Sequence, residues 1–86
     1  MNISGVVVRT RPESLNDVAG RLNKMPGVAL HATSGDGRMV ITVEDTPEGR
    51  RVSETILSVE TMDGVLSTSL AYHYCDDDLN KKEGMS

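Results

Sequence analysis

Aromatic residues are almost missing from this chain of 86 residues, which contains no Trp, no Phe and only two Tyr. The core must therefore be built from Val, Ile, Leu, Met and Ala. This shortage argues against proteins that bind single-stranded nucleic acid by stacking bases on aromatic side chains. A chain of this length forms one domain with one modest core, because it buries only about 60–65% of its unfolded surface. A large enclosed active site is therefore not expected.

Cysteine, excess positive charge and long apolar runs are lacking too. The single cysteine, Cys75, has no partner for an internal disulfide and cannot build a thiolate metal site alone. With 9 Lys and Arg against 13 Asp and Glu, the chain disfavours nucleic acid and anionic membranes and favours a basic peptide. The start of the chain holds an apolar run of three valines before Arg9, too short for a signal-peptide core or a membrane span. These features predict a cytoplasmic protein with no nucleic-acid partner and no membrane insertion.

Four segments have the residue pattern of β-strands. Stretches rich in β-branched side chains, or with alternating apolar character, lie at residues 3–10, 28–33, 38–44 and 64–73. The second and third stretches are joined by the glycine-containing turn 34–37 and are expected to form a hairpin.

Two segments between these strands have the period of amphipathic helices. The first opens at Pro12, with Ser14 in a capping-box-like position. The second opens with Asp45 or Thr46 as its cap and Pro47 at its first position. The apolar positions of the two helices are Leu15, Val18, Ala19, Leu22 and Met25, then Val52, Ile56, Val59 and Met62.

The two halves of the chain resemble each other. Met25-Pro26-Gly27-Val28 closes the first helix, and Met62-Asp63-Gly64-Val65 closes the second. A duplicated β-α-β-β-α-β order is the pattern of the ferredoxin-like α+β fold, in which right-handed crossovers place two helices on one face of a four-stranded antiparallel sheet. We predict one ferredoxin-like domain over residues 1–75, with the first and third strands central, and an acidic, disordered tail over residues 76–86.

Side-chain alternation assigns each strand residue to the helix-covered face or to the open face of this sheet. The predicted helix-facing residues are Val6 and Val8; Val28 and Leu30, with Ala32 on their side of the strand; Met39, Ile41 and Val43; and Leu66, Thr68, Leu70 and Tyr72. The predicted open face holds Gly5, Val7, Arg9, Ala29, His31, Arg38, Val40, Thr42, Val65, Ser67, Ser69, Ala71 and His73. Such short side chains leave a low surface that can admit a ligand, although β-propensity and solubility alone also explain them. A register shift of one residue would exchange the two faces.

Groups that could catalyse a reaction or hold a metal are isolated from one another. His31 and His73 each lie in a strand with no Cys, Ser-Asp or metal-ligand pattern nearby, which favours a structural or solvent-facing role. Asp76-Asp77-Asp78 fits a solvated tail, Cys75 an incidental thiol, and Arg50-Arg51 a solvated helix face rather than an export signal. The sequence therefore predicts no catalytic, metal or cofactor site.

Two other functions remain open for this fold. A small regulatory ligand-binding module, which senses amino acids or ions as a dimer, has the same predicted architecture; its metal-carrying branch requires a CxxC pair, and this chain has one Cys. An acylphosphatase-type enzyme would need an anion-cradling loop after the first strand. Arg9-Thr10-Arg11-Pro12 is a poor match for such a loop.

An ordered set of motifs resembles one family. The set consists of VVVRTRPESL at the opening of the first helix, LNKMPGV at its close, the hairpin strand GDGRMVITVE, VETMDGV at the close of the second helix, and GVLSTSLAYH before an acidic tail. Together these motifs resemble NapD, a family of small cytoplasmic chaperones dedicated to the catalytic subunit of the periplasmic nitrate reductase. The resemblance covers about residues 3–75.

The resemblance implies a function and a site. It implies a ferredoxin-like chaperone, neither an enzyme nor a cofactor carrier, that binds the twin-arginine signal peptide of the nitrate reductase precursor and delays export until the molybdenum cofactor is inserted. Family contacts on the sheet surface imply a site at Val7, Arg9, Val40, Thr42, Ser67, Ser69, Ala71 and His73. The valines and Ala71 suit an apolar peptide segment, whereas the serines, Glu44 and the acidic residues after Tyr74 suit the arginine pair. Whether the peptide lies as a helix or adds as a strand stays open.

Overall fold

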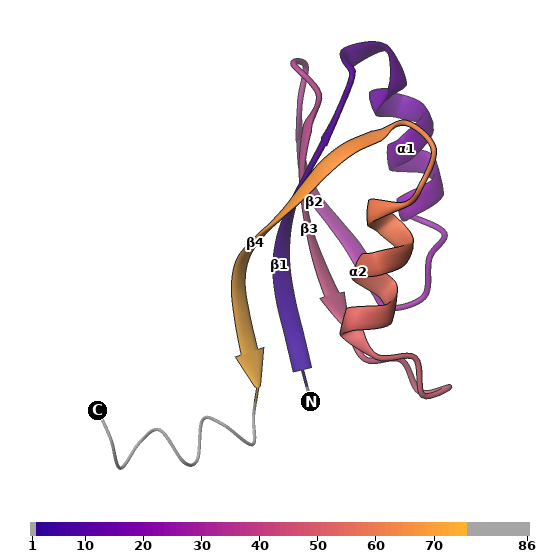
Figure 1. Cartoon of the computed structure of the whole chain (residues 1–86), viewed down its shortest axis with the longest axis vertical. Coiled ribbons are helices and arrows are strands. Elements are labelled where there is room, and N and C mark those ends of the chain that lie inside the picture. The colour runs from indigo at the N-terminus through magenta and orange to yellow at the C-terminus, as the bar shows by residue number, and fades with distance from the viewer. Residues whose placement is uncertain (1, 76–86) are drawn as a thin grey trace, which may run out of the picture.

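A computed structural model of the chain describes residues 2–75, with side chains for residues 2–73. Its elements are β1 (Asn2–Thr10), a 3₁₀ turn η1 (Pro12–Ser14), α1 (Leu15–Leu22), β2 (Val28–Ser34), β3 (Arg38–Glu44), α2 (Val52–Glu60) and β4 (Val65–Cys75). The predicted order of strands and helices is confirmed (Figure 1). The predictions for the Cys75 thiol and for the acidic tail, residues 76–86, lie outside the described residues and side chains.

The four strands form one antiparallel sheet in the order β2-β3-β1-β4. β1 and β3 occupy the centre, as predicted. Figure 1 shows both helices on the same side of the sheet, so the opposite face carries no helix of the residues that the structure describes. This arrangement is the ferredoxin-like α+β fold expected from the sequence.

The core between the sheet and the helices is aliphatic. Its buried members are Val6, Val8, Val18, Leu22, Met39, Ile41, Val43, Val52 and Val59, as the alternation of β1 and β3 and the helical period predict. Burying each of these larger side chains contributes about 1.5–3 kcal/mol relative to leaving it exposed.

The internal repeat seen in the sequence is a repeated turn. After each helix a methionine carbonyl accepts a hydrogen bond from the first amide of the next strand, at 3.3 Å for Met25 and 3.1 Å for Met62. The glycine before that strand has a positive φ in both turns, +79° at Gly27 and +97° at Gly64. Other residues rarely adopt this conformation, so both helices end in the same way for the same reason.

The start of α2 differs from the prediction, which places Pro47 at its first position. The segment instead forms a turn, in which the amide of Thr46 donates to the carbonyl of Arg50 at 3.0 Å. The helix begins only at Val52, whose amide donates to Asp45 Oδ1 at 3.1 Å. The predicted N-cap position at Asp45 or Thr46 is therefore wrong, since Arg51 is the N-cap residue, although the Asp45 side chain reaches the first amide of α2 across this turn.

The first helix also starts later than predicted. Pro12 opens η1, and α1 follows only from Leu15. The fixed φ of proline suits either kind of turn. Ser14 makes no side-chain capping hydrogen bond, so its predicted capping role is wrong.

Two β-bulges interrupt the alternation of side chains along β4. The register against β1 shifts after Val65 and again after Leu70, which leaves Leu66 and Ala71 as extra residues without a partner in β1. Each extra residue changes the face that its neighbours occupy.

The face predictions for the two ends of β4 are therefore wrong. Val65 packs against the core instead of lying on the open face, and Leu66 is 61% exposed instead of lying in the core. Beyond the second bulge, Tyr72 lies on the open face and His73 on the helix-covered face, the reverse of the prediction. Between the bulges, residues 67–70 lie on their predicted faces.

Candidate functional site

The open face of the sheet is the surface that carries no helix (Figure 1). Cross-strand partners place their side chains on the same face, so the register identifies its members. They are Ala29, His31, Ala32 and Ser34 of β2; Arg38, Val40, Thr42 and Glu44 of β3; Ile3, Gly5, Val7 and Arg9 of β1; and Ser67, Ser69 and Tyr72 of β4. The predicted binding residues that this face brings together are Val7, Arg9, Val40, Thr42, Ser67 and Ser69.

The middle of the open face is crossed by a row of short side chains, the central row, which consists of Ala32, Val40, Val7 and Ser69. Each member pairs with the next one across the sheet, so the row spans all four strands without a long side chain. A hollow of about 210 Å³ beside it is lined by Val7, Ala32, Thr33, Ser34, Arg38 and Val40. The central row therefore offers an apolar floor with a hydroxyl group at its β4 side.

Tyr72 is an open-face residue that sequence reasoning missed. It pairs with Gly5, and its ring occupies the space that a Cβ atom at position 5 would fill. The ring is half exposed and extends the apolar floor beyond the central row. A glycine inside a strand, opposite an aromatic residue, is the sequence signal for such packing. The bulge at Ala71 hides this signal from a two-residue periodicity.

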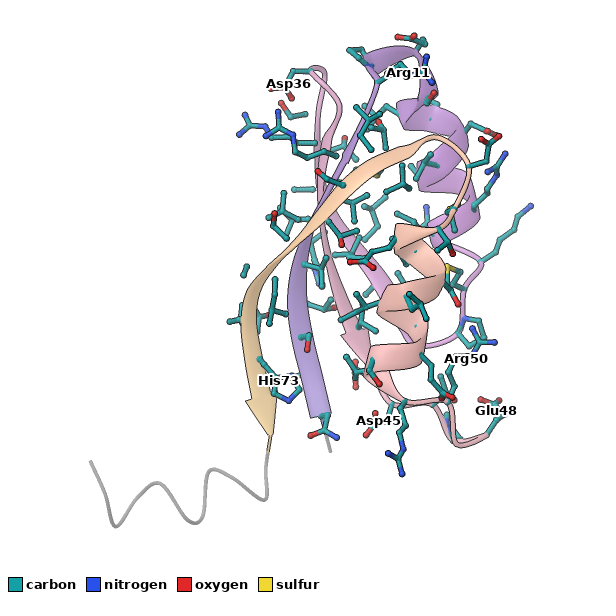
Figure 2. All side chains as sticks on the ribbon, viewed as in Figure 1. Arg11, Asp36, Asp45, Glu48, Arg50 and His73 are labelled. Atoms are coloured by element: carbon teal, nitrogen blue, oxygen red, sulfur yellow. The ribbon has the colours of Figure 1, made fainter. Side chains whose placement is uncertain are left out.

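His73 lies on the helix-covered face, so its predicted place on the open face is wrong. Its cross-strand partner is the buried Ser4, and Ser4 Oγ lies 2.7 Å from His73 Nδ1. Figure 2 shows His73 close to the end of β4, beside β1. The helix-covered face forms a pocket of about 500 Å³ here, lined by Asn2, Ser4, Asp45, Arg51, Val52, Ser53, Ile56, Leu70 and His73. Ala71, also predicted for binding, is exposed but has no partner in β1 because it is the extra residue of the bulge.

His31 lies on the open face, as predicted, although β2 contains a bulge of its own. The register against β3 shifts between Leu30 and Ala32, and His31 Nε2 lies 2.8 Å from Thr42 Oγ1. The shift also moves Ala32 to the open face opposite Val40, whereas strict alternation places it on the side of Leu30.

Charged residues lie at the two ends of the open face. Arg9 and Arg38 are direct cross-strand partners at the end near the β2–β3 turn. In that turn, Asp36 Oδ2 lies 3.2 Å from Arg38 Nε. A hydrogen bond with Ser34, which is the largest effect, and the neighbouring Arg38 lower the pKa of the Asp36 carboxyl from its ordinary value of 3.8, against the opposing effect of desolvation. Glu44 lies at the opposite end of the face.

The described residues also lack a metal-binding cluster and a membrane-spanning helix. Within the described residues, no three His, Cys, Asp or Glu side chains are placed to hold a metal ion together. The helices there are also too short or too polar to span a bilayer.

The fold defines a class of protein, a ferredoxin-like α+β domain in which both described helices cover one face of the sheet. The family follows from a direct match. The chain belongs to the NapD family, since the family model described as NapD protein matches residues 1–77. The resemblance seen in the sequence motifs is thus confirmed.

Curated relatives and a solved structure agree with this assignment. Chaperone NapD of Escherichia coli strain K12 is 30% identical over 71 residues, which are 83% of this chain and 82% of that protein. Chaperone NapD of Paracoccus pantotrophus is 28% identical over 72 residues, which are 84% of this chain and 62% of that protein. The solution structure of the E. coli Tat proofreading chaperone protein NapD is 28% identical, with a TM-score of 0.71 over 87% of this chain and 79% of that one. Membership of a chaperone family implies a protein partner.

Proposed function

We propose that this protein is a cytoplasmic chaperone that binds the twin-arginine signal peptide of the precursor of the periplasmic nitrate reductase catalytic subunit. By holding that peptide it delays export until the molybdenum cofactor is inserted. The observation that carries the proposal is the open face, which no helix covers and which short side chains cross from β2 to β4. The names of the relatives as chaperones, one of them as a Tat proofreading chaperone, support it.

The residues proposed to bind the peptide are Val7, Val40, Thr42, Ser67, Ser69 and Tyr72, with Arg9 at the margin and Ala71 beside Tyr72. The valines and the tyrosine ring supply apolar contact for the middle segment of a signal peptide. The hydroxyl groups accept charge-assisted hydrogen bonds from arginine or pair with the peptide backbone. His73 has no part in this site, because it lies on the other face. Part of the interaction energy offsets the entropic cost of ordering a flexible peptide.

Calorimetric titration of the purified protein with a synthetic nitrate reductase signal peptide tests the binding. We expect saturable binding with a Kd below about 100 μM, equivalent to about −5.5 kcal/mol. Ser69→Arg should abolish it with little loss of stability, because Ser69 is exposed in the central row. Ser53→Arg is the matched control, since Ser53 is an exposed serine of α2 on the other side of the sheet. Lack of saturable binding by the unmodified protein would refute the proposal.

A cellular experiment tests whether the protein delays export until the cofactor is inserted. In a strain that lacks this chaperone, we expect the exported nitrate reductase to contain less molybdenum per polypeptide than in the parent strain. The unmodified gene should restore the molybdenum content and the Ser69→Arg gene should not. An equal metal content with and without the chaperone would contradict a role before cofactor insertion.

A further inference from the structure

The open face is positively charged at one end. Arg9 and Arg38 pair directly across β1 and β3, and both side chains are exposed. Like charges opposite one another destabilise a sheet, so folding alone gives no reason for this pair. Asp36 offsets one of the two charges through its 3.2 Å contact with Arg38. The exposed Arg11, which follows β1 at the same end of the molecule (Figure 2), adds a further positive charge.

The opposite end of the same face carries one carboxylate. Glu44 lies there as the partner of Ile3. Asp45 follows it, but its carboxylate accepts hydrogen bonds of 3.0 Å from Asn2 and 3.1 Å from the first amide of α2 and lines the pocket on the helix-covered face. Arg51 belongs to the helix side of this end, where it lines the pocket beneath the sheet. The open face thus carries Arg9 and Arg38 at the end near the β2–β3 turn and Glu44 at the other end, so its charge changes sign along the strands. Figure 2 shows these two ends of the molecule, marked by the labels of Asp36 and Asp45.

The distance between these two ends matches the apolar segment of an export signal. From Ile3 to Arg9 the strand β1 covers about 20 Å, at about 3.3 Å per residue. An apolar segment of about 7–15 residues covers about 10–22 Å as a helix. The Debye length is about 8 Å at physiological ionic strength, so each end acts mainly on the part of the peptide that lies on it.

We propose that this charge polarity fixes the direction of the bound peptide, an inference that rests on the proposed function. The arginine pair of the peptide lies at the Glu44 end, and the apolar segment runs parallel to β1 across the central row. In the reverse direction, the arginine pair would lie beside Arg9 and Arg38 and be repelled. Arg9 and Arg38 are therefore positioning residues, which exclude the wrong direction.

Paramagnetic broadening in NMR spectra tests the direction. The protein carries Cys75→Ser, so that the only thiol in the sample is a cysteine added to the N- or C-terminus of the peptide and labelled with a nitroxide. We expect the N-terminal label to broaden the amide signals of Ile3 and Glu44, and the C-terminal label to broaden those of Arg9 and Arg38. The opposite pattern, or equal broadening at both ends from each label, would overturn the inference while binding itself persists.

Charge variants provide a second, independent test. Glu44→Gln should weaken binding of the twin-arginine peptide about three- to fivefold, which is the effect of losing an exposed ion pair. Binding of a peptide with Gln-Gln in place of the arginine pair should not change. Glu48→Gln, in the loop before α2, is the matched control and should change neither affinity. In the protein with both Arg9→Gln and Arg38→Gln, the N-terminal label should broaden the amide signals at both ends of the face, because the arginine pair of the peptide is no longer repelled from the β2–β3 turn end.

The outcomes of these tests separate the two proposals. An equal effect of Glu44→Gln on both peptides, or a single unchanged direction in the Arg9→Gln and Arg38→Gln protein, would overturn the orienting role. Loss of saturable binding in the unlabelled titration would instead overturn the proposed function, and the direction with it.

Discussion

The ring of Tyr72 in β4 lies over Gly5 of β1, where any other residue at position 5 would place its Cβ atom. Gly5 itself is buried although it lies on the face without helices. The glycine and the aromatic ring thus cover each other. The ring also extends the apolar part of the open face, where we propose that the peptide binds. This contact exists only because the bulge at Ala71 turns Tyr72 toward the open face.

Gly5→Ala should therefore destabilise the protein by about 1–3 kcal/mol, since the added methyl group must displace the ring. Urea denaturation measures this change in the free energy of unfolding. Gly20→Ala is the control, because Gly20 lies in α1 with nothing within 4 Å of the added Cβ and should gain up to about 1 kcal/mol. If Tyr72→Ala does not reduce the cost of Gly5→Ala, the proposed contact is not its cause.

Leu70 and Ile41 should respond very differently to truncation. Leu70 faces the helix side but is 62% exposed, as β4 curves away from α2 (Figure 1), whereas Ile41 is 0% exposed. Leu70→Ala should cost less than about 1 kcal/mol, and Ile41→Ala about 2–5 kcal/mol. The two midpoints of chemical denaturation give the comparison. Equal losses would mean that Leu70 is packed in solution as tightly as the core.

The hydrogen bond between Ser4 and His73 should be worth more than its exposed counterpart between His31 and Thr42. Ser4 is 1% exposed, and the N···O distances are similar, at 2.7 and 2.8 Å. Double-mutant cycles with alanine should give a coupling energy of about 1 kcal/mol for the part-buried pair of Ser4 and His73 and less than about 0.5 kcal/mol for the exposed pair. Equal coupling energies would argue against burial as the cause.

Removal of the Thr55 hydroxyl group should stabilise the protein. The Thr55 side chain is fully buried in α2, and Oγ1 has no hydrogen-bond partner among the described residues. Thr55→Val should raise the free energy of unfolding by up to about 1–2 kcal/mol, visible as a higher Tm. Thr46→Val is the opposite case, since Thr46 Oγ1 accepts the Arg50 amide at 3.0 Å and its loss should lower the Tm. A lower Tm for Thr55→Val would indicate a partner for this hydroxyl in solution.

The pKa of Asp36 should rise toward its ordinary value of 3.8 in Ser34→Ala, because the hydrogen bond with Ser34 is the main cause of its depression. A depressed pKa means that folding favours the carboxylate form of Asp36. Its contribution to the free energy of unfolding is therefore fully present above the pKa of the unfolded state and is lost as the pH falls through the pKa of the folded state. Asp36 is exposed, and the effect on global stability is accordingly small. Titration of the carboxyl carbon by NMR measures the midpoint directly, and an unchanged midpoint would contradict the assignment.

The sequence predicts this fold well wherever alternation is unbroken. Val6 and Val8, and Ile41 and Val43, lie in the core as expected, and the two Met-containing turns end both helices alike. The prediction fails where a single residue is added to a strand. A bulge leaves no mark in a two-residue period, so Tyr72 and His73 exchange faces.

The residues of the candidate site are likewise predictable from the sequence only where side-chain alternation is unbroken. The central strands place Val7, Val40 and Thr42 together because their alternation is regular. Tyr72 is missed because its place depends on a bulge and on the lack of a side chain at Gly5, two long-range conditions. The delayed start of α2 has a similar cause, since the pairing of Thr46 with Arg50 competes with a helix that begins at Pro47.

The two bulges of β4 have a consequence for solubility at high concentration. β4 is an outer strand of the sheet, and its far side is a template on which another chain could extend the sheet. Irregular spacing at Leu66 and Ala71 interrupts that template at two points and strengthens the local twist. A strand edge interrupted in this way is a poor template for the strand of another molecule, which reduces edge-to-edge aggregation.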